Sequence, residues 1–288
     1  MKSLFKKPSL GAIVICLFIS SCQKENNVQE KDMFTANEKI VIPAEAGFAA
    51  RSSEAVEYNT FYGPAVQSGN GYARSWVNIS HDDKPLAIGI EFTDGVLTQH
   101  PEEGEETHAH HTLLRLHQKA KELMPFDHLT MAYMVAGHPP PGIYSVPHFD
   151  FHFYKMPLEQ RLAIPEFADA PSLFNNLPPA GYIPPAYFRA PNEGIAQMGT
   201  HFIDLLSPEF HGQPFTHTFI YGSYDGSVTF LEPMATLAFL QAGTTVHKAI
   251  RQPQLFNPAN THYPTRYSIW KDDTKNRHYV ALYDMVLR

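Results

Sequence analysis

The sequence has very little cysteine and no surplus of basic residues. Its 288 residues include two cysteines, Cys16 and Cys22, and 22 lysines and arginines against 29 acidic residues. If the chain is cut and lipidated at Cys22, no thiol remains for an intramolecular disulfide or a cysteine nucleophile. The formal charge of −7 and pI near 6.1 argue against the basic surface that nucleic-acid-binding proteins use. The G-x-S-x-G pattern of serine hydrolases and the glycine-rich nucleotide-binding patterns are also absent.

Histidine, proline and aromatic residues are abundant instead. The chain has 16 histidines, 24 prolines, 20 phenylalanines and 14 tyrosines, with 43% hydrophobic and 18% charged residues. This composition is typical of a globular protein rather than a disordered or fibrous one. We predict a single β-rich domain over residues 41–288, long enough to bury a substantial core.

The N-terminus has the features of an export signal that ends in a lipid attachment site. Three lysines precede an apolar stretch at 11–19, which is too short to span a bilayer as a helix. Cys22 ends an ISSC sequence that resembles the lipobox of bacterial lipoproteins, whose cysteine receives a diacylglycerol. We therefore expect a signal peptide over residues 1–21 and a lipid on Cys22. The alternative is an ordinary secretory signal with an incidental cysteine.

Residues 22–40 are predicted to form a polar, lipid-anchored linker. Gln23 stands where an aspartate would resemble an inner-membrane retention signal, and residues 23–25 are similar to the charged tether of Bacteroidetes surface lipoproteins. Any solvated linker has a similar composition. We predict a bacterial outer-membrane lipoprotein, periplasmic or surface-exposed, that reaches the membrane through Cys22. Removing the signal's three lysines changes the formal charge from −7 to −10.

Short apolar runs separated by turn residues predict a fold that is α+β, mainly antiparallel β. Glycines between two of these runs and a polar KDDTKN turn are typical of hairpins. One amphipathic helix is expected over 107–124, where leucines recur at helical spacing, and a shorter helix over 158–164. The expected strands are 72–79, 86–92, 130–135, 148–154, 216–221, 228–231, 266–270 and 279–287.

Residues 165–200 differ from the rest because they contain seven prolines and several aromatic residues. A proline-rich stretch of this length cannot form a helix or a central strand. We predict a long loop, which in compact domains is typically a lid, a binding loop or an oligomer contact. The alternative is a plain surface wrap.

The HFDFHFY sequence at 148–154 carries the clearest chemical signal. As a strand it places three phenylalanines on a core face and, on the opposite face, His148, Asp150, His152 and Tyr154. Two imidazoles beside a carboxylate are suitable ligands for zinc, iron or manganese. Alternate strand residues lie roughly 6.6 Å apart and can share an ion, whereas His148 and His152, roughly 13 Å apart, cannot do so without a bulge.

A divalent-metal site on this strand needs ligands from elsewhere in the chain. The candidates are His201, Glu232 and, less directly, His217. Asp150 could bind the ion or instead orient a ligand histidine. If the metal activates water, Glu232 is also the candidate catalytic base. The alternative to a metal site is a buried hydrogen-bond network of histidine and aspartate.

Three further histidines, His108, His110 and His111, follow an acidic loop at the start of the expected helix. His108 and His111 would share a helical face, but nothing fixes a third ligand. We interpret the three as a solvated cluster rather than a metal site.

Three segments together resemble a family of bacterial envelope proteins of unknown function. They are residues 137–154 with PHFDFHFY, 198–201 with MGTH, and 215–234 with FTHTFIYGSYDGSVTFLEPM. The family comprises exported proteins and lipoproteins, and its founding structure comes from an extracytoplasmic sigma-factor stress regulon. No reaction is established for this family, so the resemblance implies which residues form a site but not which reaction they catalyse. The motif residues it implies are His138, His148, Asp150, His152, His201 and Glu232.

Two other similarities fail at a ligand position. Gly142 and His148 resemble the opening of a cupin metal motif, and the aromatic-flanked strand resembles one of the α-class carbonic anhydrases. In both families a histidine would stand where this chain has Asp150, so neither ligand set carries over.

The sequence supports three functions. The first is an envelope metalloprotein, which as an enzyme would be a metal-dependent hydrolase or oxygenase. The second is a module for a small apolar or aromatic ligand, with residues 165–200 as a lid over an apolar pocket. The third is a structural envelope protein that forms a homo-oligomer through its aromatic residues. We favour the first.

Overall fold

The computed structural model describes residues 34, 38–44, 56–98 and 111–288. The chain divides into two compact units, residues 1–36 and residues 37–288, and the described strands and helices all belong to the second. The expected signal peptide, Cys22, His108 and His110 lie outside the described residues. Within the described ranges, no helix is both long and apolar enough to cross a membrane.

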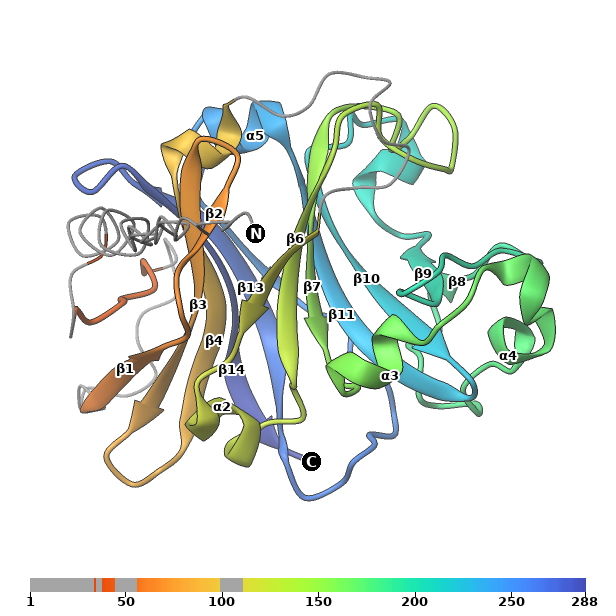
Figure 1. The fold of residues 1–288 in the computed structure, drawn as a ribbon, viewed down its shortest axis with the longest axis horizontal. Helices are drawn as coiled ribbons and strands as arrows, with labels where there is room; N and C mark the ends of the chain where they lie inside the picture. The colour runs from red at the N-terminus through yellow and green to blue at the C-terminus, as the bar shows by residue number, and fades with distance from the viewer. Residues whose placement is uncertain (1–33, 35–37, 45–55, 99–110) are drawn as a thin grey trace, which may run out of the picture. The chain divides into compact units, whose positions relative to one another are not determined.

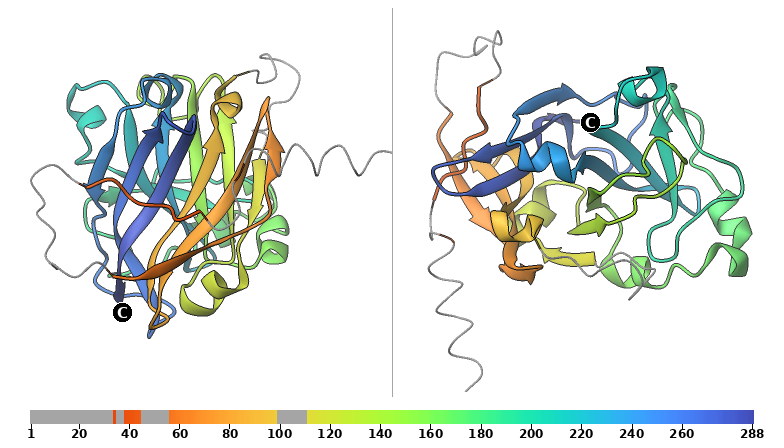
Figure 2. Two further views of the ribbon diagram at one scale, coloured as in Figure 1. Left: turned by 90° about the vertical axis from the view of Figure 1, so that its left-hand side faces the viewer. Right: turned by 90° about the horizontal axis from the view of Figure 1, so that it is seen from above.

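Two seven-stranded sheets form this unit, and each pairs its neighbouring strands antiparallel (Figures 1 and 2). Sheet A has the order β1-β3-β4-β14-β13-β12, with β2 paired to β3, and sheet B has the order β5-β6-β7-β11-β10-β9-β8. This confirms the prediction of a mainly antiparallel β fold. The strands of sheet A are β1 (Tyr58–Tyr62), β2 (Val66–Ser68), β3 (Gly71–Ser80), β4 (Pro85–Thr93), β12 (Val246–Ala249), β13 (His262–Asp272) and β14 (Arg277–Leu287). Those of sheet B are β5 (His111–Arg115), β6 (His128–Met134), β7 (His148–Tyr154), β8 (Tyr187–Phe188), β9 (Thr200–Asp204), β10 (His217–Tyr224) and β11 (Ser227–Thr236).

The helices of the described residues are short, and there are more of them than expected. The short helix expected at 158–164 is present as α3. The α-helices are α2 (Gln118–Leu123), α3 (Leu158–Leu162), α4 (Pro171–Asn175) and α5 (Leu237–Gln241). The 3-10 turns are η1 (Asp94–Leu97), η2 (Phe167–Asp169) and η3 (Pro208–His211).

The prediction of a long amphipathic helix over 107–124 was wrong. Residues 111–115 form β5, which pairs with β6, and a helix begins only at Gln118. Leu114 is fully buried, while Leu113, paired with Thr130, lies on the opposite face of the sheet. Pairing with the open edge of β6 satisfies the backbone hydrogen-bonding groups of residues 111–115 and buries Leu114. This stabilises a strand more than the helix that the leucine spacing predicts.

The Pro-rich segment 165–200 is not an uninterrupted loop. It contains η2, α4 and the two-residue strand β8, which extends the edge of sheet B by pairing with β9. Pro171 begins α4, a position where a proline costs no helical hydrogen bond.

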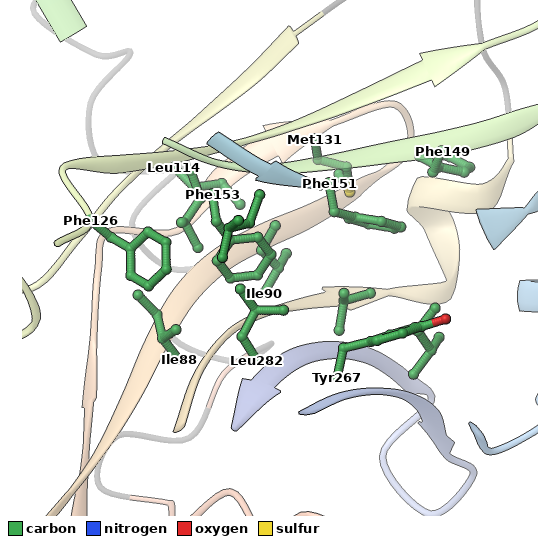
Figure 3. Packing of buried hydrophobic residues seen from close by; sticks show 14 of the residues in the cluster. Ile88, Ile90, Leu114, Phe126, Met131, Phe149, Phe151, Phe153, Tyr267 and Leu282 are labelled. Atoms are coloured by element: carbon green, nitrogen blue, oxygen red, sulfur yellow. The ribbon is translucent and has the colours of Figure 1, made fainter. Parts of the chain in front are cut away.

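The main core lies between the two sheets and includes the phenylalanine face of β7 (Figure 3). Phe149, Phe151 and Phe153 are at most 1% exposed. The ring of Phe92 on β4 stacks on Phe149 and Phe151, with centroids 6.4 and 5.9 Å away. The structure therefore confirms this face as core, and it directs the alternate side chains of β7 to the far side of sheet B.

That far side of sheet B is also buried, although it faces away from sheet A. All seven residues of β7 are buried, so its polar side chains are withdrawn from water. Tyr144, in the segment that precedes β7, is fully buried among Phe215, Ile220 and Met234. This second, smaller apolar cluster encloses polar side chains that an ordinary solvent-facing strand would expose.

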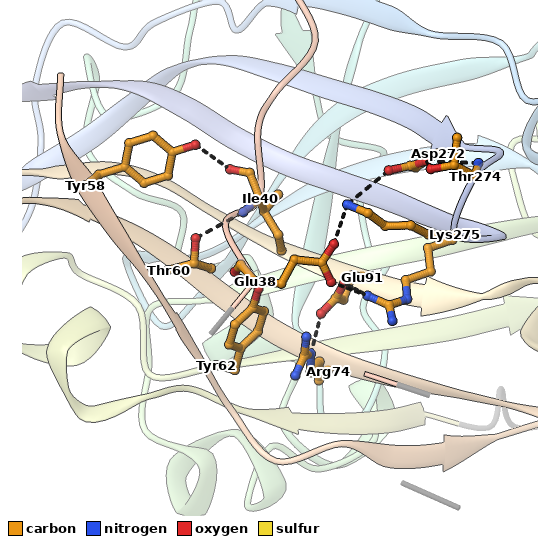
Figure 4. A network of polar contacts seen from close by, with 11 residues as sticks. Glu38, Ile40, Tyr58, Thr60, Tyr62, Arg74, Glu91, Asp272, Thr274 and Lys275 are labelled. Atoms are coloured by element: carbon orange, nitrogen blue, oxygen red, sulfur yellow. Dashed lines mark hydrogen bonds and ion pairs between the residues drawn. The ribbon is translucent and has the colours of Figure 1, made fainter. Parts of the chain in front are cut away.

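A charged network lies on the outer face of sheet A and holds residues 38–40 against it (Figure 4). Glu91 pairs with Arg74, and both side chains are less than a tenth exposed. Glu38, which we assigned to the linker, accepts a hydrogen bond of 3.0 Å from Arg277 Nη1. Glu38 thus belongs with the folded domain rather than with the linker.

Candidate metal centre

Sheet B brings the polar side chains of β7 and β11 next to one another. Asp150 pairs with Met234 and Phe153 with Leu231, so Glu232 lies across from His152. Glu232 pairs in turn with Ile220 on β10. Figure 1 shows β7 and β11 side by side near the middle of sheet B.

His201 reaches the same face from β9, across a glycine. It pairs with Gly222 of β10. A Cβ atom on Gly222 would lie 1.9 Å from Cζ of Phe230, so only glycine leaves room for that ring. The Phe230 ring packs edge-on against His152 and His201, with centroids 5.0 and 5.1 Å away. Gly222 therefore helps to position both histidines.

The first ligand group consists of His138, His148 and Asp150, whose ligand atoms all lie within 4.8 Å of one another. His148 Nε2 is 3.2 Å from Asp150 Oδ1, and His138 Nε2 is 3.6 Å from Asp150 Oδ2. His148 is fully buried and the Asp150 side chain is 5% exposed, whereas His138 is 21% exposed. His138 belongs to the segment between β6 and β7 and forms the accessible side of this group.

Backbone carbonyls fix how both histidines of the first group point. Nδ1 of His148 donates to Val146 O at 2.6 Å, and Nδ1 of His138 donates to Pro139 O at 2.7 Å. A carbonyl only accepts, so each Nδ1 carries a proton and each Nε2 faces Asp150. In a protonated ring that Nε2 donates to the carboxylate, and in a neutral ring it offers a lone pair to a cation. Metal-binding histidines are commonly oriented by such a bond on the second ring nitrogen.

The second ligand group consists of His152, His201 and Glu232. Glu232 Oε2 lies 3.4 Å from His152 Nε2 and 3.6 Å from His201 Nε2. His152 is fully buried and Glu232 is 1% exposed, whereas His201 is 20% exposed. Each group thus has two enclosed residues and one partly exposed histidine, through which an ion could enter.

Several of these ligand atoms lack hydrogen bonds. Among the described residues, no hydrogen-bond partner exists for His148 Nε2, Asp150 Oδ1, either ring nitrogen of His152, or Glu232 Oε2. A buried polar atom without a partner costs on the order of 1–3 kcal/mol, and such atoms are uncommon in folded proteins. Such atoms are concentrated in the two ligand groups, where a bound ion would satisfy them.

The electrostatics of the two groups differ. Burial raises the pKa of Asp150, but the imidazoles of His148 and His138 outweigh it and hold the pKa well below 3.8. Burial lowers the pKa of His152 well below 6.5 and that of His201 to about 4. Burial and the charge of Asp150 raise the pKa of Glu232 well above 4.5. Without an ion, the second group is therefore neutral, with its histidines in the form that binds metals.

The structure places the sequence-derived candidates unequally. It brings together His148, Asp150, His152, His201 and Glu232, but divides them between two groups, and His148 and His152 do not share one. His217 lies elsewhere, with its Nδ1 2.9 Å from the hydroxyl of Tyr267. Tyr154 belongs to neither group, and its buried ring stacks on His152 with centroids 5.4 Å apart.

Two contributions were not expected from strand geometry. His138 was singled out only by family resemblance, and nothing in its local sequence predicts that its loop folds back onto Asp150. His111 was interpreted as part of a solvated cluster, yet its ring lies on β5 with its centroid 6.0 Å from that of His152. His111 therefore lies beside the second group.

A scan against protein-family models, a search of curated proteins and a search of solved structures found no match to this chain. The geometry of the two ligand groups is therefore the basis for a functional assignment.

Proposed function

We propose that this chain is a divalent-metal-binding protein in which each of the two ligand groups holds one ion. The observation that carries the proposal is the convergence of His148 Nε2 and Asp150 Oδ1, two buried potential ligand atoms that lie 3.2 Å apart and make no hydrogen bond among the described residues. In the neutral form of the ring their lone pairs repel each other. A cation bound to both atoms turns this repulsion into two coordinate bonds.

The donor set favours a first-row transition metal. Each group offers two imidazole nitrogens and one carboxylate, a combination suited to zinc, iron(II) or manganese. Calcium and magnesium prefer sets made only of oxygen atoms. The described residues contain no cysteine, so they offer no thiolate ligand for copper(I). Three protein ligands would leave coordination positions open for water or a substrate.

A catalytic role would follow from those open positions. A water molecule bound to such an ion is acidified and can act as the nucleophile of a hydrolysis. Zinc would favour hydrolysis, and iron(II) bound by two histidines and a carboxylate would favour oxygenase chemistry. Glu232 is assigned here as a metal ligand rather than as the base, because its buried Oε2 points at both histidines.

Metal content tests the proposal. The chain is purified without a histidine tag and its metals are measured by plasma mass spectrometry, beside His148→Ala and His152→Ala. His217→Ala is the matched control, since His217 bonds to Tyr267 outside both groups. We expect two equivalents in the parent and the control and one in each site variant. Folded parent protein that takes up no zinc, iron or manganese on addition would refute the proposal, and the polar groups would then form a hydrogen-bond network.

The proposal includes an envelope location, supported by the ISSC sequence at Cys22 and the basic and apolar stretches before it. Metabolic labelling with radioactive palmitate tests it. Incorporation in the parent and none in Cys22→Ser is the expected result, and equal labelling of both would contradict lipidation at this residue.

A further inference from the structure

A second candidate site lies on the core-facing side of sheet B. It is a cavity of about 160 Å³ that shares no residue with either ligand group. Leu231 of β11 and Tyr221 of β10 line it, and these residues point to the opposite face of the sheet from Glu232. Pro178, Pro179 and Tyr182 of the Pro-rich segment close another side.

The walls of this cavity are mostly apolar and aromatic. Val228, Pro253, Leu255 and Pro264 contribute aliphatic surface. Aromatic rings surround the space, and they belong to Tyr182, Tyr221, Phe256 and Tyr263. An engineered cavity of about 150 Å³ holds one benzene molecule, so this space fits a single six-membered ring.

Lys155 is the one charged residue among the described residues that line the cavity. Its ammonium donates one hydrogen bond, of 2.7 Å, to Asn257 O and lies 5.3 Å from the centre of the Tyr263 ring. No carboxylate of the described residues pairs with it. Lys155 is partly buried at the cavity wall, and this burial lowers the pKa of Lys155 from 10.5 to about 8. Two of its three donor positions remain for an anionic partner.

Gln252 provides a second polar atom at the cavity, one that lacks a hydrogen-bond partner among the described residues. Its Nε2 donates to Ile250 O at 3.0 Å and to Pro264 O at 3.2 Å. Both partners are carbonyls, which fixes the orientation of the amide. Its Oε1 is then a buried acceptor that finds no donor within the described residues. A ligand hydroxyl would satisfy it.

We infer that this cavity binds a small aromatic carboxylate that carries a hydroxyl group, a molecule of the hydroxybenzoate class. The ring fills the apolar space between the tyrosines, the carboxylate pairs with Lys155, and the hydroxyl donates to Gln252 Oε1. A neutral aromatic would leave the ammonium unpaired, and an aliphatic acid would lose the contacts between rings.

Calorimetric titration of the purified chain with 4-hydroxybenzoate tests the inference. Benzoate, 4-hydroxybenzyl alcohol and cyclohexanecarboxylate serve as the comparison ligands. We expect saturable binding of 4-hydroxybenzoate, roughly fivefold weaker binding of benzoate, and binding of the neutral alcohol weakened by roughly tenfold or more. Cyclohexanecarboxylate should also bind more weakly. Absence of saturable binding, or equal affinity for acid and alcohol, would overturn the inference.

Variants locate the site. Lys155→Met should weaken the binding of 4-hydroxybenzoate roughly tenfold or more. Lys248→Met, at an exposed lysine, should leave this binding unchanged. Leu255→Trp, at a lining residue that is 49% exposed and so tolerates a larger side chain, should block the cavity even if the lysine variant is poorly folded. His148→Ala should bind the acid like the parent, which separates failure of this inference from failure of the metal proposal. Unchanged binding in both Lys155→Met and Leu255→Trp would place the ligand elsewhere.

Discussion

His148 Nε2 and Asp150 Oδ1 lie 3.2 Å apart in a buried part of sheet B, and neither makes a hydrogen bond among the described residues. Val146 O accepts the proton of the other ring nitrogen of His148, so Nε2 can donate to Asp150 only when the ring is protonated, and a bound metal ion would take the place of that proton. The sequence places these residues two apart on one strand, and the fold then encloses them.

Replacing the carboxylate of the first group should remove one ion. Asp150→Asn keeps the size of the side chain but lacks the charge, so we expect the affinity for the first ion to fall by roughly tenfold or more. Asp204→Asn is the matched control, because Asp204 is a buried carboxylate paired with Arg251. Competition with a chromophoric chelator measures both affinities. Equal loss in the two variants would indicate a general structural effect.

Adding a methyl group at Gly222 should disturb the second group more than the first. The Cβ of Gly222→Ala would collide with the Phe230 ring, which packs on both His152 and His201. We expect destabilisation of about 1–3 kcal/mol in urea unfolding and weaker binding of the second ion. Gly142→Ala is the comparison, since a Cβ there meets no atom within 4 Å, although its positive φ carries a strain of its own. If Gly222→Ala bound the second ion with unchanged affinity, this would contradict the role of Gly222 in positioning His152 and His201.

The stability of the metal-free protein should depend on pH through His128. This histidine stacks on Tyr154, with centroids 4.8 Å apart, and lies near Asp127 and Arg161. Burial lowers the pKa of His128 to about 4. Between pH 6.5 and pH 4 the unfolded chain binds a proton that the folded chain does not, so stability falls as the pH is lowered.

Urea unfolding at pH 7 and pH 5, in the presence of a chelator, measures this contribution. The parent should lose about 2 kcal/mol more than His128→Gln between these values. His211→Gln, at an exposed histidine, is the control and should behave like the parent. Identical losses in the parent and His128→Gln would show that His128 does not titrate as proposed.

Binding of benzoate in the Lys155 cavity should weaken in alkaline solution. The carboxylate needs the ammonium form of Lys155, whose pKa is about 8 in the free protein, so the affinity should be constant near pH 6–7 and fall above pH 8. The other groups facing the lysine stay neutral in this range, because burial raises the pKa of Tyr221 and Tyr263. Titrations in Lys155→Met should show no such fall. A fall of equal size in that variant would assign the pH dependence to another group.

The sequence predicts the local pattern of the site better than its assembly. Alternation along 148–154 identifies both faces of β7, since the side-chain period of a strand is two. The same spacing argument separates His148 from His152, and the structure puts them in different groups. Pairing these residues with Glu232 and His201 depends on strand order, which one sequence does not reveal.

The elements that the sequence misjudged depend on tertiary partners. Residues 111–115 have leucines compatible with a helix, but β6 offers an open edge that makes a strand more favourable. His138 reaches Asp150 because its loop folds back over β7, a long-range event without a local signal. The cavity at Lys155 is likewise built from distant segments, although the Pro-rich stretch did suggest an apolar pocket.

The most direct test of the metal proposal is an anomalous-scattering map from crystals of the chain grown with zinc. The account predicts two peaks, one within about 2.0–2.2 Å of ligand atoms of His138, His148 and Asp150, and one at the same distances from His152, His201 and Glu232. Well-ordered crystals without a peak at either group, or with zinc only at other histidines, would contradict it.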